Sequence, residues 1–437
     1  MLDCSQTKLD SGLPVIRVPM SSVESTTVLV LANTGSRYEQ PDQHGIAHFF
    51  EHLVFKGTAK YPTAQDLAKV VDGIGANFNA FTSKEFTGYY VQAAARHLEL
   101  ALEVVAEMLL APQLRQDDID REKGVIIEEM NMYADMPAHH IANLFEQMVY
   151  NGTGLGHDVI GEKETVANLT AVDFRAFLDD WYDLGNLQLV IAGDHRRVED
   201  EKLLDVIEQQ FGRAPESQRR PAKIDISRHT TARTKGRIFA AERFHLEERR
   251  SEQAHFVLGW PAMPRRDERR YALSLLSVII GGNMSSRLFS EVREKRGLAY
   301  YVHSDLDHFH DGGLLGAAAG VDPGRVEEAL RVTIGEFLEL GEGRQPVTAE
   351  ELAAAKEYLA GKTVLGLEDS QRVAQYFGMR QLLLDEVESP QRLLKKIKAV
   401  KLEELNRLAA ELLRPEELRL AVIGPFSDST PFTQFVQ

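Results

Sequence analysis

The strongest constraint on the fold is a similarity between the two halves of the chain. Residues 166–194 and 397–425 align without a gap at an offset of 231. In both segments, large side chains recur at helical spacing, and alternating apolar residues then lead to Gly193 and Gly424. Each segment is therefore predicted to form a helix, a short turn and a buried strand. The shared register indicates that the chain contains a duplicated folding unit.

The starts of the two halves support the same organisation. Residues 26–39 and 253–267 each have the pattern of a strand that leads into a polar loop and a helix. Such strands are mixed with long helical stretches, for example at 97–110 and 323–341. This mixture predicts an α+β fold with two homologous domains, each a mostly antiparallel β-sheet with helices packed on it.

A polar segment at 212–237, rich in Arg and Lys, interrupts the pattern midway. Its composition is typical of a connection between domains rather than of a packed element. A length of 437 residues also exceeds that of one typical domain. We therefore expect an N-terminal domain at 1–215, a linker at 216–235 and a homologous C-terminal domain at 236–437.

Charge and composition exclude several classes of protein. The formal net charge of −16 argues against a nucleic-acid partner, because phosphate contacts need clustered Lys and Arg. The single cysteine, Cys4, excludes an intramolecular disulfide and a cysteine-based zinc site. The N-terminal residues show no signal-peptide pattern, and the apolar stretch at 271–280 is too short to cross a bilayer. We expect a cytoplasmic protein without a membrane partner, although a chain trimmed of its leader would look the same.

The residues that point to a chemical function lie at 48–52, in the pattern His-x-x-Glu-His. On a helix, His48 and His52 stand one turn apart on the same face, so both imidazoles can reach one metal ion. Glu51 projects beside them, where it can hold a water bound to that metal. A pair of satisfied core histidines is the alternative that this pattern alone leaves open.

A catalytic zinc needs a third protein ligand and one open position. The segment at 118–136 offers Glu128 and Glu129, which helical phase places on different faces. Glu129 shares an apolar face with Glu122 and Ile126, and a carboxylate there needs a partner because an unpaired buried charge is costly. Glu129 is therefore the better ligand, and Glu122 is placed to hydrogen-bond a ligating histidine. Phase alone leaves open that both belong to a solvated helix face.

Together these residues resemble the pitrilysin family of zinc metallopeptidases, which includes insulin-degrading enzyme and the mitochondrial processing peptidase. The family's inverted motif matches residues 48–52, and its "FKGT" sequence follows at 55–58. Its third metal ligand falls on Glu129, and its assisting glutamate falls on Glu122. The resemblance, which runs essentially from end to end, implies that His48, His52 and Glu129 bind Zn²⁺.

The resemblance also implies a strand that binds peptide substrates. The family's "NA-x-T" motif matches Asn79, Ala80 and Thr82. In the family this strand is an edge that pairs with the substrate backbone, so Asn79, Ala80 and Phe81 are the expected substrate-binding residues. Such pairing fixes the register of an extended peptide without demanding particular side chains.

The second half carries a further family feature at 281–304. It resembles a stretch in which an arginine and a tyrosine, seven residues apart, approach the substrate; these are Arg293 and Tyr300. A guanidinium and a phenol are suitable donors for a developing oxyanion. The alternative is a surface helix ending at Gly297, after which Tyr300 only begins a strand. Opposite the metal motif, the second half has "LSVII" at 276–280, so one zinc per chain is expected.

Two other histidine pairs have less support as metal ligands. His308 and His310 fall on one side of an expected strand, but no third ligand is evident, which favours an exposed polar face. His139 and His140 follow the segment of the expected third ligand without metal-ligand spacing.

The implied function is that of a zinc metalloendopeptidase acting on unfolded peptides or short polypeptides. Glu51 is expected to take a proton from the metal-bound water and to deliver it to the leaving amine. By resemblance, a chain of this length is half of a clam-shell chamber. A homodimer or a heterodimer with a metal-free homologue would close it. A non-catalytic peptide-binding or assembly subunit is the rival class, and such subunits usually lose the ligands and the glutamate. A hydrolase of non-peptide substrates is a third alternative, which the peptide-pairing edge disfavours.

Overall fold

The computed structural model describes residues 2–215, 218 and 238–436. Apart from Gln218, the linker predicted at 216–235 lies outside the described residues. The chain forms two compact units. The first unit contains residues 1–130, 157–231 and 363–390, and the second contains residues 131–156, 232–362 and 391–437.

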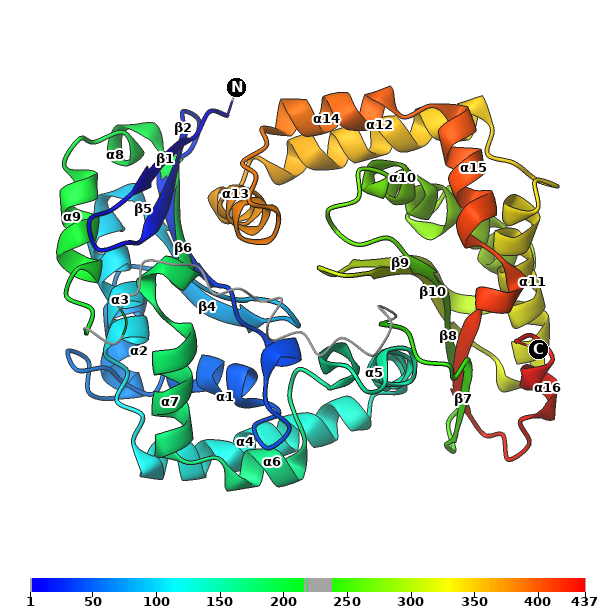
Figure 1. Ribbon diagram of the computed structural model, residues 1–437, viewed down its shortest axis with the longest axis horizontal. Coiled ribbons are helices and arrows are strands. Elements are labelled where there is room, and N and C mark those ends of the chain that lie inside the picture. Colours follow the sequence, from blue (N-terminus) through cyan, green and yellow to red (C-terminus); the bar gives the residue numbers. More distant parts are fainter. Residues whose placement is uncertain (1, 216–217, 219–237, 437) are drawn as a thin grey trace. The chain divides into compact units, whose positions relative to one another are not determined.

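The first unit is built on a six-stranded sheet (Figure 1). In spatial order its strands are β1 (Ser5–Lys8), β2 (Pro14–Met20), β6 (Leu187–Asp194), β3 (Ser25–Ala32), β5 (Thr87–Ala94) and β4 (Asn77–Thr82). Only β2 and β6 pair in parallel, and the other neighbours are antiparallel. The strand β4 lies at one edge of the sheet, so among the described residues of this unit one side of its backbone has no strand partner.

The second unit is built on a five-stranded sheet of the same topology. In spatial order its strands are β7 (Phe244–Glu248), β11 (Arg419–Gly424), β8 (Ala254–Ala262), β10 (Gly313–Val321) and β9 (Ala299–His308). The first two strands pair in parallel and the rest pair antiparallel. This order repeats β2, β6, β3, β5 and β4 of the first sheet. The predicted α+β class with two homologous, mostly antiparallel domains is confirmed.

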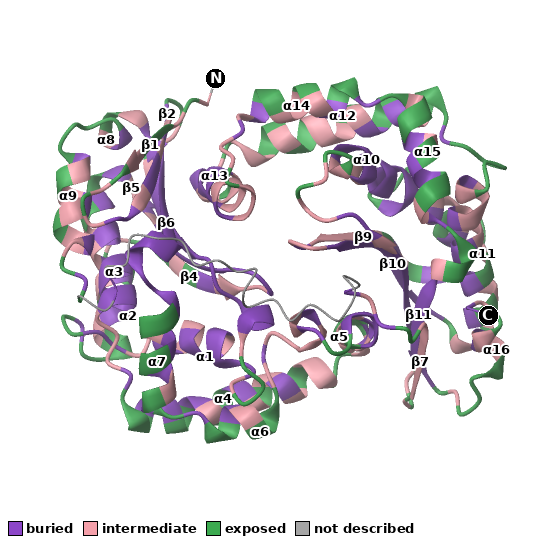
Figure 2. Cartoon of the chain, in the orientation of Figure 1, coloured by how far each residue is buried: buried purple, intermediate pink, exposed green. Residues whose placement is uncertain are grey.

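The central strands are buried because helices cover both faces of the sheet. Figure 2 shows this burial for both units, and in β3 the residues from Thr26 to Ala32 are all buried. Side chains alternate between the faces of a strand. Leu29 and Leu31 therefore face α13 (Ser370–Leu384), where they share a core with Phe377. The helix α3 (Leu98–Leu110) packs on β3 and β5 as well.

Each sheet is covered by one helix that comes from the other half of the sequence. The helix α13 belongs to the second half of the chain, yet it packs on β3 and β6 of the first unit. Conversely, α5 (Pro137–Tyr150) belongs to the first half and packs on β8 and β11 of the second unit through Ile141 and Phe145. The two halves therefore exchange one segment each. The boundaries expected at 215 and 236 stay a prediction.

The remaining helices surround these sheets. In the first half they are α1 (Ile46–Leu53), α2 (Ala64–Asp72), α4 (Gln116–Ala134), α6 (Lys163–Asn168), α7 (Ala171–Trp181), α8 (His195–Val198) and α9 (Leu203–Phe211). In the second half they are α10 (Arg270–Gly281), α11 (Val326–Gly341), α12 (Ala349–Gly366), α14 (Pro390–Ala399), α15 (Leu402–Leu412) and α16 (Thr430–Thr433). In the described part of the chain, every helix is too short or too polar to span a bilayer.

Candidate metal centre

The helix α1 carries the His-x-x-Glu-His residues and has a fixed start. Its N-cap residue, Gly45, has φ 97°, a left-handed conformation that favours glycine. The Glu39 carboxylate accepts hydrogen bonds from the backbone N–H groups of Gly45 and Ala47, each at 2.8 Å. These bonds satisfy donors that would otherwise be free at a helix start. They fix the residue at which α1 begins, and this start determines the direction in which each later side chain of the helix points.

The apolar face of α1 packs against α7 and so orients the polar face. The ring of Phe49 meets that of Phe174 at a centroid distance of 4.9 Å, and the ring of Phe50 meets that of Phe177 at 5.8 Å. Both α1 phenylalanines are fully buried. The half-buried side chains of the metal motif emerge on the other side of the helix.

His48, His52 and Glu129 converge in the first unit. Their potential ligand atoms all lie within 4.8 Å of one another. The Glu129 Oε2 atom is 3.9 Å from His48 Nε2 and 3.6 Å from His52 Nε2. Glu129 is half-buried on α4, whereas Glu128 is exposed, as the helical phase predicted. The structure thus brings together the three residues that the sequence selected, and their role as ligands stays a prediction.

Glu122 lies one layer behind this cluster. Its Oε1 atom is 3.0 Å from His52 Nδ1, and its Oε2 atom is 2.6 Å from Lys56 Nζ. Burial raises the pKa of Glu122, but the hydrogen bonds from His52 and Lys56 outweigh this effect and leave the pKa lowered. An ionised Glu122 accepts a hydrogen bond from the Nδ1–H group of His52. The lone pair of this imidazole is then on Nε2, the nitrogen that faces Glu129.

The donor set fits a zinc ion. Burial, followed by the proximity of His52, lowers the pKa of His48 to about 3, so this imidazole is neutral and able to coordinate. Its Nδ1 is buried without a hydrogen-bond partner in the described part of the chain, and its Nε2 is too far from Glu129 for a hydrogen bond. Two imidazoles and one carboxylate are a typical ligand set of a catalytic zinc site.

Glu51 is held beside the cluster by the edge strand. The Thr82 hydroxyl, at the end of β4, donates to Glu51 Oε2 at 2.5 Å. Burial raises the pKa of Glu51, and the Thr82 hydrogen bond opposes this effect in part. A raised pKa suits a carboxylate that must accept a proton and later release it.

The expected substrate strand is β4. Asn79 is exposed and Ala80 is buried, and the Ala80 N–H donates to the Asn79 side-chain oxygen at 2.9 Å. The Phe81 ring lies directly over Gly88 of β5, where a Cβ atom would come within 2.2 Å of the ring. Phe81 therefore packs against its own sheet. The Asn79 side-chain oxygen accepts a hydrogen bond from a backbone N–H group of the same strand. Substrate binding by these residues stays a prediction.

Arg293 and Tyr300 are neighbours in the second unit. Arg293 is in a π-helical turn (Phe289–Glu294), and Tyr300 is the second residue of β9. The guanidinium carbon of Arg293 lies 5.9 Å from the Tyr300 ring centroid and 5.0 Å from that of Phe289. Tyr300 is 75% exposed, which is unusual for a large aromatic side chain at the start of a strand. Their approach to a substrate stays a prediction.

Sequence reasoning missed two contacts that shape the site. Lys56 follows His52 by four residues, a helical spacing that could have placed it near the partner of His52. The contact of Thr82 with Glu51 had no such signal, because a loop and a helix separate the two residues in sequence. Among the other histidines, neither His308 nor His310 joins a group of three potential ligands within the described ranges.

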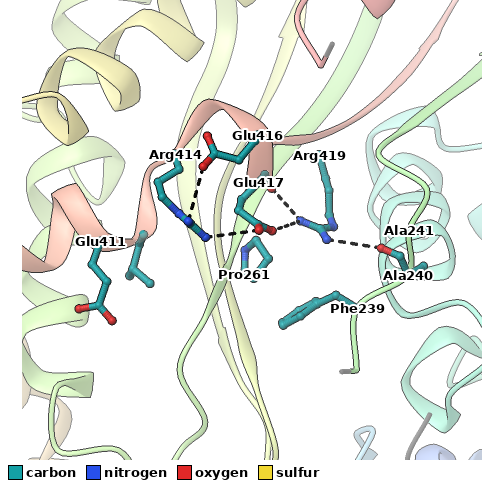
Figure 3. A pocket seen from close by; sticks show the side chains of 10 residues that line it. Phe239, Ala240, Ala241, Pro261, Glu411, Arg414, Glu416, Glu417 and Arg419 are labelled. Atoms are coloured by element: carbon teal, nitrogen blue, oxygen red, sulfur yellow. Dashed lines mark hydrogen bonds and ion pairs between the residues drawn. The ribbon is translucent and has the colours of Figure 1, made fainter. Parts of the chain in front are cut away.

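A large pocket of the second unit lies near the ends of β8 and β11 (Figure 3). Its charged side chains already pair with each other, with the backbone or, in the case of Glu411, with Arg269. Arg414 pairs with Glu416 and Glu417, and Arg419 bonds to the carbonyl oxygens of Glu417 and Ala240. These pairings give the pocket no evident catalytic group, and we assign it no role.

Two family models match the chain. Residues 16–163 match Insulinase (Peptidase family M16), and residues 168–359 match the Peptidase M16 inactive domain. A Streptomyces coelicolor protein named an uncharacterized zinc protease is 37% identical, over 97% of this chain and 90% of that protein. A Bacillus subtilis protein, also named an uncharacterized zinc protease, is 33% identical, over 95% of this chain and 97% of that protein.

Solved structures share the fold. A protease from Helicobacter pylori superposes with a TM-score of 0.86 at 23% identity, over 97% of this chain and 100% of that chain. A peptidase M16 inactive domain from Pseudomonas fluorescens gives a TM-score of 0.86 at 20% identity, over 97% of this chain and 98% of that chain. The relatives and the two family models together cover nearly the whole sequence, so the chain belongs to peptidase family M16, the insulinase family.

Proposed function

We propose that the protein is a zinc-dependent endopeptidase that hydrolyses unfolded peptides or short polypeptides. The observation that carries this proposal is the convergence of His48, His52 and Glu129 beside a half-buried carboxylate, Glu51. The zinc proteases among the relatives support the same reading. A structural zinc site would use all of its ligands from protein, whereas three protein ligands leave a position for water or substrate.

His48, His52 and Glu129 would hold the ion. When bound, zinc supplies Lewis-acid chemistry that polarises the scissile carbonyl and makes water acidic enough to be deprotonated near neutral pH. Glu122 keeps His52 in the tautomer that leaves Nε2 free for coordination. Lys56 holds Glu122 in place from the other side.

Glu51 is the proposed general base. Its carboxylate removes a proton from the attacking water as the new C–O bond forms, and it returns that proton to the amine as the C–N bond breaks. Thr82 fixes the orientation of Glu51 through its hydroxyl. Because Thr82 ends β4, the same strand that would bind substrate also positions the base.

Substrate recognition is proposed to use the free edge of β4. An extended peptide can add to such an edge through backbone hydrogen bonds. Binding of this kind requires the Asn79 side-chain oxygen to give up the hydrogen bond that it accepts from the Ala80 N–H. Arg293 and Tyr300 are proposed to donate hydrogen bonds to the substrate carbonyl or its oxyanion.

We further propose that two chains assemble around one cavity, with Arg293 and Tyr300 of one chain facing the zinc of the other. A homodimer fits a chain that carries both the metal residues and this pair, and a heterodimer with a metal-free homologue is the other form. Analytical ultracentrifugation with an activity assay tests the assembly. A monodisperse monomer with full activity at low concentration would contradict it.

The test of function pairs zinc content with cleavage of a quenched peptide. We expect Glu51→Gln to retain zinc and to lose cleavage, because the substitution removes the base but no ligand. Glu129→Gln should lose both zinc and cleavage. Glu128→Gln, one residue away on the exposed face of α4, is the matched control and should keep both. Unchanged cleavage in Glu51→Gln would remove Glu51 from this role. A zinc-loaded wild type without any cleavage would instead favour a non-catalytic subunit.

A further inference from the structure

A second group of potential metal ligands lies in the first unit, apart from the residues assigned above. His44 precedes the start of α1, and His157 and Glu162 come from the loop that leads into α6. One ligand atom of each lies within 4.8 Å of the other two. His44 Nδ1 is 3.9 Å from Glu162 Oε1, and the two imidazole rings lie 3.6 Å apart at an angle of 34°.

This group has the composition of the first one. Each consists of two imidazoles and one glutamate whose potential ligand atoms lie close together. In a tetrahedral zinc site with bonds of about 2.0–2.2 Å, ligand atoms lie roughly 3.3–3.6 Å apart. A shift of less than 1 Å at the exposed end of Glu162 would reach that spacing from the 3.9 Å separation.

Close backbone contact between two loops brings these residues together. Gly45 and Gly161 both have positive φ, at 97° and 81°. A Cβ atom on Gly161 would lie 2.3 Å from the His44 carbonyl oxygen, so the two loops touch at backbone distance. The Thr165 hydroxyl donates to the same His44 carbonyl at 2.6 Å. Larger residues at these glycines would force His44 and the 157–162 loop apart.

The group is buried on one side and open to solvent on the other. His44 is buried, His157 is half-buried and Glu162 is exposed, so an ion can enter from the Glu162 side. The Lys84 ammonium donates to the His157 carbonyl at 2.5 Å, which holds the loop and places one positive charge nearby. Two carboxylates, Glu162 and Asp42, act electrostatically on His44 and offset that charge.

We propose that His44, His157 and Glu162 form a second divalent-cation site, which takes Zn²⁺ with a water in the fourth position. This ion ties the residue before α1 to the loop before α6. Because α1 begins at Ile46 and carries the catalytic motif, the second site clamps the helix from which the catalytic residues project. We expect Zn²⁺ rather than Ca²⁺ or Mg²⁺ in this site, because two of its three ligands are imidazoles, which bind borderline-soft metal ions.

Zinc stoichiometry of the full chain tests this proposal, measured by mass spectrometry of the metal after dialysis against buffered free zinc. We expect two zinc ions per wild-type chain, one in His157→Gln, one in His48→Gln and none in the double variant. His97→Gln changes a histidine outside both groups and should retain two. A wild type with one ion, or a His157→Gln variant with as many ions as the wild type, would overturn the second site.

A second measurement separates this site from the proposed catalytic one and does not depend on activity. In the His48→Gln background, added zinc should still raise the thermal unfolding temperature, because a ligand that binds only the folded state stabilises it. Glu162→Gln keeps a side-chain oxygen that can cap α6 as the Glu162 carboxylate does, but it removes the charge, and it should weaken this zinc binding by at least about tenfold. An equal zinc-induced shift with and without Glu162→Gln would count against the site even if the catalytic assignment holds.

Discussion

Glu122 shows how a buried carboxylate on a helix can remain ionised. Its position on an apolar face would alone favour the neutral acid, but His52 and Lys56 each contact one of its two oxygens. The pair of contacts explains why the pKa of Glu122 is lowered in spite of burial. The same contacts link Glu122 to the orientation of His52, which is a proposed zinc ligand.

We therefore predict that Glu122→Gln weakens zinc binding without abolishing it. A glutamine can still hydrogen-bond His52, but it leaves Lys56 without a carboxylate and makes His52 a weaker ligand. Loss of such a supporting carboxylate typically costs about 10–100-fold in metal affinity. Competition with a chromophoric chelator measures the change. Glu128→Gln, on the exposed face of the same helix, should bind zinc as the wild type does; equal affinities of the two variants would refute the supporting role.

Asp194 provides a pH-dependent prediction outside the metal site. It caps α8 by accepting from the Arg196 N–H, and it forms an ion pair with the Arg196 guanidinium. The Arg196 side chain lowers the pKa of Asp194 to about 2 from 3.8. A carboxyl with a lowered pKa in the folded state adds stability above pH 3.8, and this stability is lost as the pH falls toward 2.

The variant Asp194→Asn keeps a capping oxygen but removes the charge. Because Arg196 is 69% exposed, we expect a loss of only about 0.5–1 kcal/mol at pH 7, as for other surface pairs. The difference from wild type should shrink as the pH falls below 4. Urea unfolding at several pH values, with both chains metal-free, measures it. A difference that stays constant down to pH 2 would show that the charge contributes nothing.

At the level of elements, the docking of α13 on the first sheet depends on a small residue. A Cβ atom at Gly378 would lie 2.8 Å from a Leu31 methyl and 2.9 Å from a Val190 methyl, both in fully buried side chains. The helix can therefore approach β3 and β6 closely only with glycine at this point. Glycine is otherwise unfavourable within a helix by about 1 kcal/mol relative to alanine.

We predict that Gly378→Ala destabilises the protein in spite of the better helix propensity of alanine. Overpacking of a filled core typically costs about 1–3 kcal/mol, which exceeds the gain in propensity. Gly335→Ala in α11 is the matched control, because nothing lies within 4 Å of its added Cβ, and it should stabilise by up to about 1 kcal/mol. Thermal unfolding of the two variants should therefore move in opposite directions. A stabilised Gly378→Ala would show that α13 does not pack tightly.

Elements close in sequence were predictable, whereas contacts set by tertiary packing were not. His48 and His52 follow from helical spacing, and helical phase separates Glu129 from Glu128. In contrast, the pairing of His44 with His157 depends on two loops that touch at Gly45 and Gly161, which no local pattern reports. Sequence periodicity therefore cannot identify residues, such as these two histidines, that are brought together by contact between loop backbones.

At the level of the whole molecule, the duplication was visible because strand and helix patterns repeat in one register. The exchange of segments was not visible. The periodicity of α5 and α13 shows that each has an apolar face, with Phe145 and Phe377 at the centre of it, but an apolar face fits either sheet equally well. Only the assembled structure shows that each helix covers the sheet of the other half.

This exchange predicts how the chain responds to being divided at the linker. A fragment of residues 1–215 lacks α13, so Leu29, Leu31 and Val190 would lose the cover of Phe377 and face water. A fragment of residues 236–437 lacks α5, which exposes Val257 and Ile423 in the same way. Uncovered apolar sheet surfaces of this kind promote aggregation. We expect each fragment alone to be insoluble or to bind a hydrophobic dye strongly.

Co-expression of the two fragments should restore a soluble, zinc-binding complex, because each supplies the helix that the other lacks. Size-exclusion chromatography and zinc content of the co-expressed pair measure this. As a control, Phe377→Ala in the second fragment should weaken the complex, since truncating a buried phenylalanine costs about 3–5 kcal/mol. Two fragments that each fold alone, and gain nothing from being together, would show that the exchanged helices are dispensable to the sheets they cover.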